Sequence, residues 1–543
     1  MSHSHKNRIY SSFKIGPCKG ANIAEVVDPK TASQYNSVRE GSRRFEFPRG
    51  ALAMSELKTE VLIIGGGILG AAVARELSKY KIDATLVEKE VDFGWGSTKA
   101  NLCIVNQGGD ALEFRKEYQR SKLVWESMPM MEPLCRELDV PFKRIGELTI
   151  IRNNDEMAKY RKLKTRAESV GITCHQFIDQ ETLRTMEPNV TKEAIGALYD
   201  PMIAIVDPVR LTMALAENAE QNGVNTMRET EVLDISPGID EFEVQTNQGI
   251  IRSKFIVNAA GIFVDKIAAL VNADDFVVFP IKGYVGVLDK NVGGLISHEI
   301  HTRPEVPGQM NIVTPSVYGN LFFGTTMQLS KRHDYSTTRE TAEIALRTAQ
   351  RVVPDISEKD IINSFTGYLM FRNWELGWHE CVVSASGKVP RFINVCIGYP
   401  GVSAAPATAK KVSKLLNEEG LRLEENPDFN PHRKAIIDFS ELSLEQKRAL
   451  VTEDARYGHV VCRCETVTEG EVVDAIARGA TTLDGVKFRT RAGMGRCQGG
   501  FCSPRVSRIL ARELDIPEEE VTKKGAGSRH LLYKSKRLLE EMA

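Results

Sequence analysis

The chain has 543 residues, which is enough for several domains with large apolar cores. Its 71 basic and 72 acidic residues nearly cancel, so no overall field favours nucleic acid or an anionic membrane surface as a partner. The sequence has no apolar run long enough to span a bilayer, and residues 1–6 lack the apolar core of a signal peptide. Ten cysteines in so large a chain, four of them close together near the C-terminus, indicate reduced thiols, so we expect a cytoplasmic protein.

Residues 1–57 form an N-terminal extension ahead of the first clear strand pattern. The segment is modestly basic, with Arg39, Arg43 and Arg44 as examples, and it has no clear period. Two interpretations remain open for it, an unstructured leader or an arm that lies across a partner subunit.

One strand–turn–helix–strand unit follows this extension. Residues 61–64 are continuously apolar, as expected of a strand buried on both faces of a parallel sheet. Gly65, Gly67 and Gly70 follow in the G-x-G-x-x-G order, and Glu88 closes the second strand. The first glycine permits a tight turn, the second lets backbone N–H groups approach a pyrophosphate, and the third allows close helix–strand packing. Because Glu88 suits an unphosphorylated ribose, the unit predicts a dinucleotide site for FAD or NAD rather than NADP.

The next loop, Phe93–Asn101, is rich in small and hydroxyl-bearing residues. Ser97 and Thr98 can donate hydroxyl hydrogen bonds to a pyrophosphate. The place of the loop soon after Glu88 favours that role over an ordinary surface loop.

Helical patterns then cover residues 112–137, 159–171 and 209–223, and short strands form a meander between residues 230 and 251. The apolar strand 255–261 ends in Ala-Ala-Gly, which lets its backbone pass close to a ligand at the edge of a parallel sheet.

Residues 276–383 contain several short strand candidates and one helix, 339–351. We expect a mostly antiparallel sheet that forms the floor of a substrate cavity against the nucleotide domain. A glycine-rich turn, 398–403, and a helix, 405–416, follow the next buried strand. The positive end of that helix dipole suits an electron-rich flavin carbonyl.

Four cysteines near the C-terminus have the spacing of a metal or cluster site. Cys462 and Cys464 form a C-x-C pair, and Cys497 and Cys502 form a C-x4-C pair with glycine neighbours. Four thiolates suit a soft metal or an iron–sulfur cluster, whereas structural zinc more often uses C-x2-C pairs. The six other cysteines are scattered singly, and each is more typical of a small buried apolar residue than of a ligand.

Helices predicted at 468–479 and 503–514 surround these cysteines, so we expect a small helical domain over residues 431–520 and a C-terminal tail over 521–543.

The chain resembles the FAD-dependent D-amino-acid-oxidase superfamily in five features and in their order along the sequence. These features are the glycine motif, the acid at position 88, the 97–101 loop, the Asn-Ala-Ala-Gly strand end and the 401–406 turn. Within that superfamily the chain looks most like the A subunits of anaerobic glycerol-3-phosphate dehydrogenases and their 2-hydroxyglutarate-oxidising relatives. The cysteine segment resembles the [2Fe–2S] domain of bacterioferritin-associated ferredoxin.

The resemblance implies an α/β fold with a Rossmann-type FAD-binding domain over residues 58–430, an antiparallel-sheet substrate domain inserted at about 276–383, and a small helical [2Fe–2S] domain. It also implies hydride transfer from a C–H bond to the flavin, and FAD and a [2Fe–2S] cluster as cofactors. The cluster ligands that it implies are the four C-terminal cysteines. The implied FAD-binding residues are Gly65, Gly67, Gly70, Glu88, Lys89, Ser97, Thr98, Asn101, Val232, Ala260, Gly261, Gly398, Gly401, Val402 and Ser403.

Two positions depart from the pattern of these relatives. Relatives commonly carry a histidine-bearing stretch after the Lys-Ala-Asn motif, whereas this chain has Asn106 there. They also carry an arginine in a Phe-x-Gly-Leu-Arg stretch that grips the acidic group of the substrate. Here the corresponding stretch ends in Leu369, and the next arginine is Arg372. A hydroxylated substrate and an amine or imino acid therefore both remain open.

A flavin accepts two electrons at a time and a [2Fe–2S] centre carries one. The presence of both in one chain therefore predicts that the substrate is oxidised at the flavin and that the electrons leave one at a time through the cluster to another protein. We expect a dehydrogenase of a small hydroxylated substrate, in a hetero-oligomer with an electron-accepting flavoprotein or iron–sulfur subunit. The alternatives are an amine or imino-acid dehydrogenase and a non-catalytic electron-transfer subunit.

The candidate catalytic residues are Lys282, Tyr284, Arg372 and His379. His379 could act as a general base near neutral pH. For each of these residues a purely structural role is the alternative.

Overall fold

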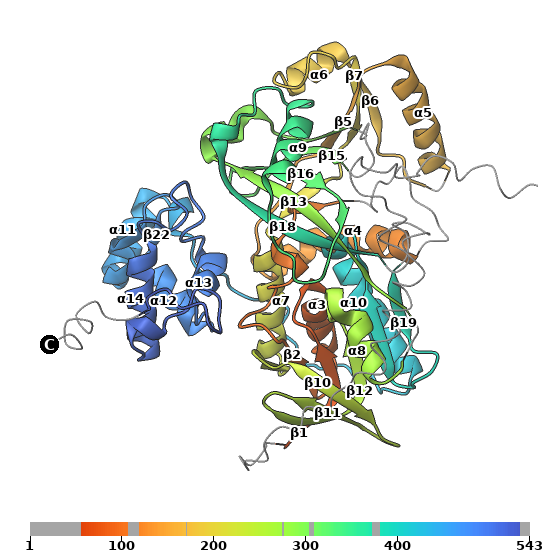
Figure 1. Ribbon diagram of the computed structural model, residues 1–543, viewed down its shortest axis with the longest axis vertical. Helices are drawn as coiled ribbons and strands as arrows, with labels where there is room; N and C mark the ends of the chain where they lie inside the picture. Colours follow the sequence, from red (N-terminus) through yellow and green to blue (C-terminus); the bar gives the residue numbers. More distant parts are fainter. Residues whose placement is uncertain are drawn as a thin grey trace, which may run out of the picture.

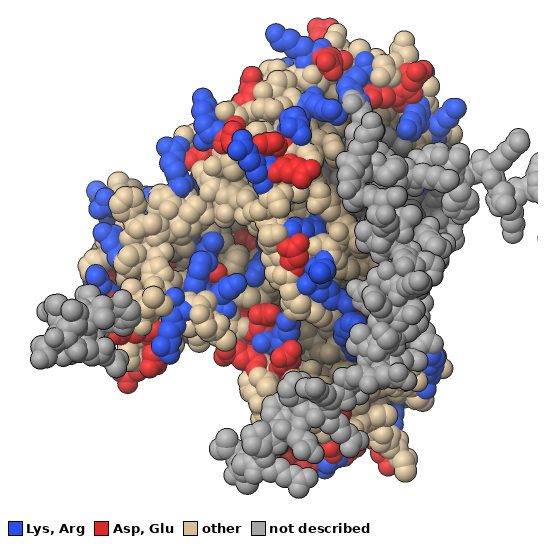
Figure 2. Space-filling model, in the orientation of Figure 1, with Lys and Arg blue, Asp and Glu red and all other residues tan. Residues whose placement is uncertain are grey.

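The computed structural model describes residues 56–106, 119–169, 171–273, 276–302, 309–371 and 381–532 (Figure 1). The N-terminal extension up to residue 55 and two predicted catalytic residues, Arg372 and His379, lie outside these ranges. Within the described ranges, no helix is both long and apolar enough to cross a bilayer. Basic and acidic side chains are interspersed over the face shown in Figure 2, in keeping with the nearly balanced charge.

The first layer is a mixed eight-stranded sheet in the order β10-β11-β12-β1-β2-β9, with β20 beside β12 and β19 beside β20. Its strands are β1 (Glu56–Ile64), β2 (Ala84–Val87), β9 (Asn225–Met227), β10 (Val232–Pro237), β11 (Phe242–Thr246), β12 (Gly249–Asn258), β19 (Val382–Ala385) and β20 (Phe392–Cys396). Parallel pairs join β1 to β2 and β12, and β12 to β20. The turns that follow these parallel strands therefore meet at one edge of the sheet.

Helices α3 (Ile68–Leu77), α7 (Pro208–Gln221) and α10 (Gly401–Glu418) cover one face of this sheet, and α4 (Gln119–Glu137) packs against α10 (Figure 1). Their apolar side chains and those of the sheet form one large core. The short helix α8 (Val264–Leu270) packs on the opposite face.

The second layer is a nine-stranded sheet in the order β17-β13-β16-β15-β14-β5-β7-β6, with β18 paired to β13. Its strands are β5 (Glu147–Ile151), β6 (Gln176–Asp179), β7 (Gly196–Asp200), β13 (Phe279–Leu288), β14 (Glu299–Thr302), β15 (Gln309–Pro315), β16 (Leu321–Thr326), β17 (Gln328–Leu329) and β18 (Ile361–Phe371). Its pairs are antiparallel apart from β14 with β5, as the sequence pattern suggests. Three strands come from residues 147–200, outside the segment predicted for this sheet, because pairing between distant segments leaves no local signal.

Helices α6 (Gln180–Met186) and α9 (Arg339–Gln350) pack on one face of the second sheet around a core that contains Tyr284 and Phe323. Helix α5 (Asn154–Glu168) packs on the β5–β7 end of the sheet through Tyr160. A small sheet of β3 (Ile104–Val105), β8 (Ala204–Val206) and β4 (Phe142–Arg144) connects the two layers.

The C-terminal region forms a small body of its own, drawn in blue in Figure 1. It contains α11 (Leu444–Glu453), β21 (Val460–Cys462), β22 (Val467–Thr468), α12 (Glu469–Ala477), α13 (Leu483–Thr490) and α14 (Ser503–Leu514). Thr468 starts α12 with a capping box, in which its side chain and that of Glu471 each accept from the other residue's backbone N–H. The apolar residues of these elements form a separate core, and α13 packs beside α7.

Candidate flavin and iron–sulfur sites

A cavity of about 470 Å³ lies where the turns of the first sheet face the second sheet. The turns after β1, β2 and β12 line one side, and residues of β13, β15 and β18 line the other. Most of the predicted FAD-binding residues border this cavity: Gly65, Gly67, Glu88, Lys89, Ser97, Thr98, Asn101, Val232, Ala260, Gly261, Gly398, Gly401 and Val402. Gly70 and Ser403 are not part of its lining.

The glycine-rich turn after β1 is tight enough to require glycine. Gly65 has φ +105°, and a Cβ there would lie 2.6 Å from the carbonyl oxygen of Ala259. A Cβ at Gly70 would lie 1.9 Å from the Gly65 carbonyl oxygen, so this glycine acts in packing rather than in lining the cavity. The Thr98 hydroxyl accepts a hydrogen bond from the Ile68 N–H at 3.2 Å, which caps α3 at the cavity edge. The positive end of the α3 dipole therefore borders the cavity and suits an anionic ligand.

Glu88 stands at the end of β2 with both carboxylate oxygens engaged. Its Oε2 accepts from the Gly66 N–H at 2.7 Å and its Oε1 from the Glu90 N–H at 2.9 Å. Burial raises the pKa of Glu88 to about 7 despite these hydrogen bonds. Each oxygen keeps a further lone pair for a ribose hydroxyl.

The opposite end of the cavity is formed by three segments in close contact. A Cβ at Gly367 would lie 2.2 Å from the Ala100 carbonyl oxygen, and a Cβ at Gly398 would lie 2.2 Å from that of Met370. A Cβ at Gly401 would meet no protein atom within 4 Å, so the backbone leaves open space there. The side chains at this end are mainly apolar: Leu102, Ile104, Val285, Ile312, Leu369 and Met370. Such walls suit a flat ring system such as a flavin.

Lys282 and Tyr284, both predicted to be catalytic, lie on β13 but do not line the cavity. Their neighbours Gly283 and Val285 line it instead, because successive residues of a strand point to opposite faces. The Lys282 Nζ donates to Asp334 Oδ2 at 3.0 Å and to the Ser336 hydroxyl at 2.9 Å. Tyr284 lies in the apolar core of the second sheet, where burial raises its pKa. The other two candidates, Arg372 and His379, are outside the described residues.

Asn106, which stands where relatives commonly carry a histidine, is held by hydrogen bonds within the protein. Its Nδ2 donates to the Tyr399 hydroxyl at 2.9 Å, and its backbone N–H donates to the Ser403 hydroxyl at 3.1 Å. Ser403 is 1 % exposed, so its hydroxyl serves this internal bond rather than the cavity.

Aromatic residues that were not predicted from the sequence also line the cavity, among them Trp95, Phe263, His333 and Tyr335. His333 has φ +70° and its ring lies 5.1 Å from that of Phe263. Trp95 lies within the predicted pyrophosphate loop, so its position in the sequence could have identified it. Nothing in the local pattern around residues 333–335 does so.

The four C-terminal cysteines come together in the small helical body. Cys464 Sγ lies 3.7 Å from Cys497 Sγ, while Cys462 and Cys502 are buried behind them. Hydrogen bonds from the Cys502 thiol and from backbone N–H groups lower the pKa of Cys462 to about 6. Thiolates bound to one tetrahedral metal lie about 3.8 Å apart, given metal–sulfur bonds of about 2.3 Å. The sulfur spacing and the surrounding N–H groups therefore fit a thiolate-bound metal centre.

Glycine is required beside these cysteines. A Cβ at Gly495 would lie 2.3 Å from the Cys464 Cβ, and Gly493 and Gly499 have φ of +93° and +88°. The close turns let backbone N–H groups point at cluster sulfurs, which lowers the cost of their negative charge.

The small helical body is fixed to the flavin-binding layer by a buried ion pair. Arg489 on α13 contacts Asp92 through two hydrogen bonds, one of them 3.0 Å long, and both side chains are 3 % exposed. Beside this pair, the rings of Trp95 and Phe488 meet edge to face at 5.1 Å. Trp95 therefore touches the cavity on one side and the cysteine-bearing body on the other.

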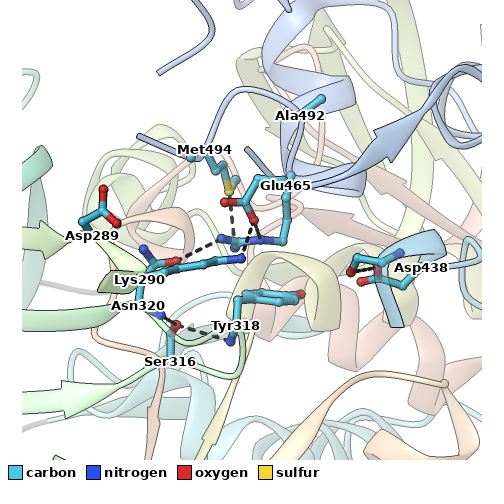
Figure 3. A network of polar contacts seen from close by, with 12 residues as sticks. Asp289, Lys290, Ser316, Tyr318, Asn320, Asp438, Glu465, Ala492 and Met494 are labelled. Carbon is cyan, nitrogen blue, oxygen red and sulfur yellow. Dashed lines mark hydrogen bonds and ion pairs between the residues drawn. The ribbon is translucent and has the colours of Figure 1, made fainter. Parts of the chain in front are cut away.

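A second polar network joins this body to the second sheet (Figure 3). Glu465, next to Cys464, accepts from Lys290 Nζ and from Arg491 Nε, both at 2.9 Å. The Arg491 guanidinium also donates to Asn320 Oδ1 at 3.2 Å and stacks 3.8 Å from the centre of the Tyr318 ring. The loops after β13 and between β15 and β16 are thus held against a cysteine-bearing turn.

Comparison with known proteins agrees with both sites. Residues 60–415 match the family of FAD dependent oxidoreductases, and residues 460–512 match the BFD-like [2Fe-2S] binding domain. The chain is 41 % identical over 473 residues to the glycerol 3-phosphate dehydrogenase of Caloramator mitchellensis, covering 86 % of this chain and 97 % of the relative. It is 26 % identical over 490 residues to one of the subunits of the anaerobic glycerol-3-phosphate dehydrogenase of Escherichia coli K12, covering 84 % of this chain and 88 % of the relative.

A solved structure of the L-α-glycerophosphate oxidase of Mycoplasma pneumoniae with FAD bound is similar, with a TM-score of 0.64 and 27 % identity over 69 % of this chain and 98 % of that one. The glycine oxidase of Geobacillus kaustophilus shares the fold, with a TM-score of 0.60 and 22 % identity. The cofactors of this enzyme are FAD and a [2Fe–2S] cluster. The chain belongs to the family of FAD-dependent oxidoreductases and carries a C-terminal BFD-like [2Fe–2S] domain.

Proposed function

We propose that this enzyme oxidises the secondary hydroxyl of glycerol 3-phosphate at FAD and passes the electrons through its [2Fe–2S] domain to a partner subunit. The observation that carries the proposal is the docking of the cysteine-bearing domain onto the cavity wall, where Trp95 lines the cavity and packs against Phe488. The names of the relatives, glycerol 3-phosphate dehydrogenases and oxidases, support the choice of substrate.

When bound, FAD supplies a two-electron acceptor and the cluster a one-electron carrier. The chain's own residues would hold the FAD and keep water away from it. The turn at Gly65 and Gly67 would offer backbone N–H groups and the α3 dipole to the pyrophosphate, and Glu88 would accept hydrogen bonds from the ribose. The apolar side chains at the Leu369 end would exclude water from the flat ring of the ligand.

We propose that Arg372 grips the phosphate of the substrate. It directly follows β18, whose residues Gly367 to Met370 line the apolar end of the cavity, and the position that carries arginine in relatives is Leu369 here. A guanidinium can bind phosphate with two parallel hydrogen bonds. The same substitution at Leu369 favours a second candidate function, oxidation of an amine or imino acid that has no phosphate to bind.

For the export of electrons, we propose an electron-accepting flavoprotein or iron–sulfur subunit in the cytoplasm. The domain has an accessible side, because Cys464 is exposed and Phe501, next to Cys502, is 82 % exposed. A large exposed aromatic side chain beside a redox centre is typical of a protein contact.

Anaerobic mixing with glycerol 3-phosphate tests this function. We expect the flavin absorbance to bleach first and the electron paramagnetic resonance signal of the reduced cluster to follow. A variant with Cys464→Ser and Cys497→Ser should still bleach its flavin with the same substrate. Bleaching by glycine or L-proline but not by glycerol 3-phosphate would replace this proposal with the amine alternative, and bleaching by none of them would indicate a non-catalytic subunit.

Rapid peroxide formation with glycerol 3-phosphate in air, undiminished in the variant with Cys464→Ser and Cys497→Ser, would contradict export through the cluster. Arg372→Lys should raise KM for glycerol 3-phosphate far more than it lowers kcat, because an ammonium keeps the charge but loses the two-point contact.

A further inference from the structure

A group of three potential metal ligands lies at the far end of the second sheet, away from both cofactor sites. Cys174 and His175 end the loop between α5 and β6, and Asp200 is the last residue of β7, the strand paired with β6. The ligand atoms of the three side chains all lie within 4.8 Å of one another. None of the three residues lines the flavin cavity.

We propose that Cys174, His175 and Asp200 bind a zinc ion that ties the α5–β6 loop to the end of β7. The proposal does not depend on the substrate or on the electron acceptor of the enzyme.

The distances within the group are close to those of a coordination shell, and the Cys174 thiol is also within hydrogen-bond distance of Asp200 Oδ1. His175 Nε2 lies 3.5 Å from Asp200 Oδ2, and Cys174 Sγ lies 3.8 Å from Asp200 Oδ1. An N–H···O hydrogen bond is about 2.7–3.2 Å long, so the first distance is too long for one. Ligands around a tetrahedral zinc lie about 3.4 Å (N to O) and about 3.6 Å (S to O) apart, given the usual bond lengths. The Cys174 sulfur and the His175 ring nitrogen lie within 4.8 Å of each other, so side-chain rotations would have to bring this pair closer for all three to bind one ion.

Burial makes a cation at this place favourable. His175 is 5 % exposed and Asp200 is 6 % exposed. The His175 Nδ1 is buried and, among the described residues, has no hydrogen-bond partner. A divalent cation would balance one thiolate and one carboxylate and leave the site neutral.

The donor set selects the metal. One thiolate, one imidazole and one carboxylate are ligands typical of Zn²⁺, whereas Mg²⁺ and Ca²⁺ prefer oxygen donors alone. Cys174 is half-buried and packs beside Ala167 and Ile172, which leaves an approach for the ion from one side. Three protein ligands leave a fourth position for water.

Metal analysis of the full-length holoprotein, purified anaerobically, tests the proposal. After incubation with Zn²⁺ and removal of the excess, we expect about one zinc per chain in addition to the two irons of a [2Fe–2S] cluster. Cys174→Ser and His175→Gln should each lose this zinc while keeping iron and FAD. Cys381→Ser, a half-buried single cysteine elsewhere, is the matched control and should keep all three.

Cobalt gives a second readout of the same site. Co²⁺ bound in place of zinc should produce a thiolate-to-cobalt absorption band in the wild-type protein and in the cluster-free variant Cys464→Ser, but not in Cys174→Ser. A chelator should lower the Tm of the wild-type protein and leave that of Cys174→Ser unchanged. The proposal is overturned if the wild-type protein takes up no zinc, if Cys174→Ser retains it, or if zinc enters only when iron is missing from the C-terminal site.

Discussion

The buried ion pair between Asp92 and Arg489 should hold the [2Fe–2S] domain against the FAD-binding layer, and Arg489→Met tests this. Both side chains are 3 % exposed, so the substitution leaves the carboxylate buried without its counterion. Removing one partner of a buried ion pair costs about 3–5 kcal/mol. Arg489 also donates to the carbonyl oxygens of Gly485 and Arg478, so we expect the free energy of unfolding of the docked domain to fall by about 3–5 kcal/mol.

The assay is chemical denaturation, followed in the same sample by flavin fluorescence and by cluster absorbance. In Arg489→Met the cluster transition should move to lower denaturant while the flavin transition moves less, because the two cores are separate. The double variant with Asp92→Leu should recover most of the loss, since an apolar pair can replace a buried ion pair at little cost. In stopped-flow experiments, flavin reduction by substrate should be unchanged and cluster reduction slower.

A matched control is Arg508→Met, which removes an exposed pair with Glu518 whose side chains are 70 % and 42 % exposed. Such pairs contribute about 0–1 kcal/mol. If Arg489→Met also costs less than about 1 kcal/mol, or if the double variant is as unstable as the single one, the ion pair does not hold the domain.

Three further predictions concern the flavin site. Gly70→Ala should abolish FAD binding, because its Cβ would lie 1.9 Å from the Gly65 carbonyl oxygen. Gly96→Ala is the control and should keep FAD, because a Cβ at Gly96 meets nothing within 4 Å. The FAD content of the two purified variants checks this. FAD affinity should rise with pH up to about 7 and then level off, because the pKa of Glu88 is raised to about 7 and the ionised form accepts more hydrogen bonds. The free energy of unfolding of the apoprotein should instead fall as the pH rises from 4.5, the ordinary pKa of this side chain, to about 7, because the folded state binds the proton more tightly. FAD titration and thermal unfolding across this pH range measure the two effects. Neither effect should be present in Glu88→Gln, which is the control. Lys282→Met should leave kcat nearly unchanged and cost about 1 kcal/mol of stability, because the amine points away from the cavity; a large loss of kcat in steady-state assays would contradict this orientation.

Features that depend on neighbouring residues were predictable from the sequence. The apolar run before Gly65 and the glycine spacing predict β1, the turn and α3, because each requirement acts over a few residues. The pairs around Cys462 and Cys497 likewise reveal a ligand set, since cysteines at such short spacings reach one centre only through tight turns.

Features that depend on strand parity or distant contacts were not predictable. Lys282 and Tyr284 belong to the strand expected beside the cavity, but a shift of one residue decides which face a side chain occupies. The partners Asp92 and Arg489 are 397 residues apart, and neither has a local pattern that indicates the other.

The segment from Glu88 to Thr98 links the two cofactor sites in one piece of backbone. Glu88 borders the cavity, Asp92 binds Arg489, Trp95 contacts both the cavity and Phe488, and Thr98 caps α3. A ligand that orders this segment lowers the entropic cost of docking the [2Fe–2S] domain, and by linkage a docked domain must strengthen FAD binding by the same factor. FAD should therefore raise the denaturant midpoint of the cluster transition in the wild-type protein, and this effect should be much smaller in Arg489→Met.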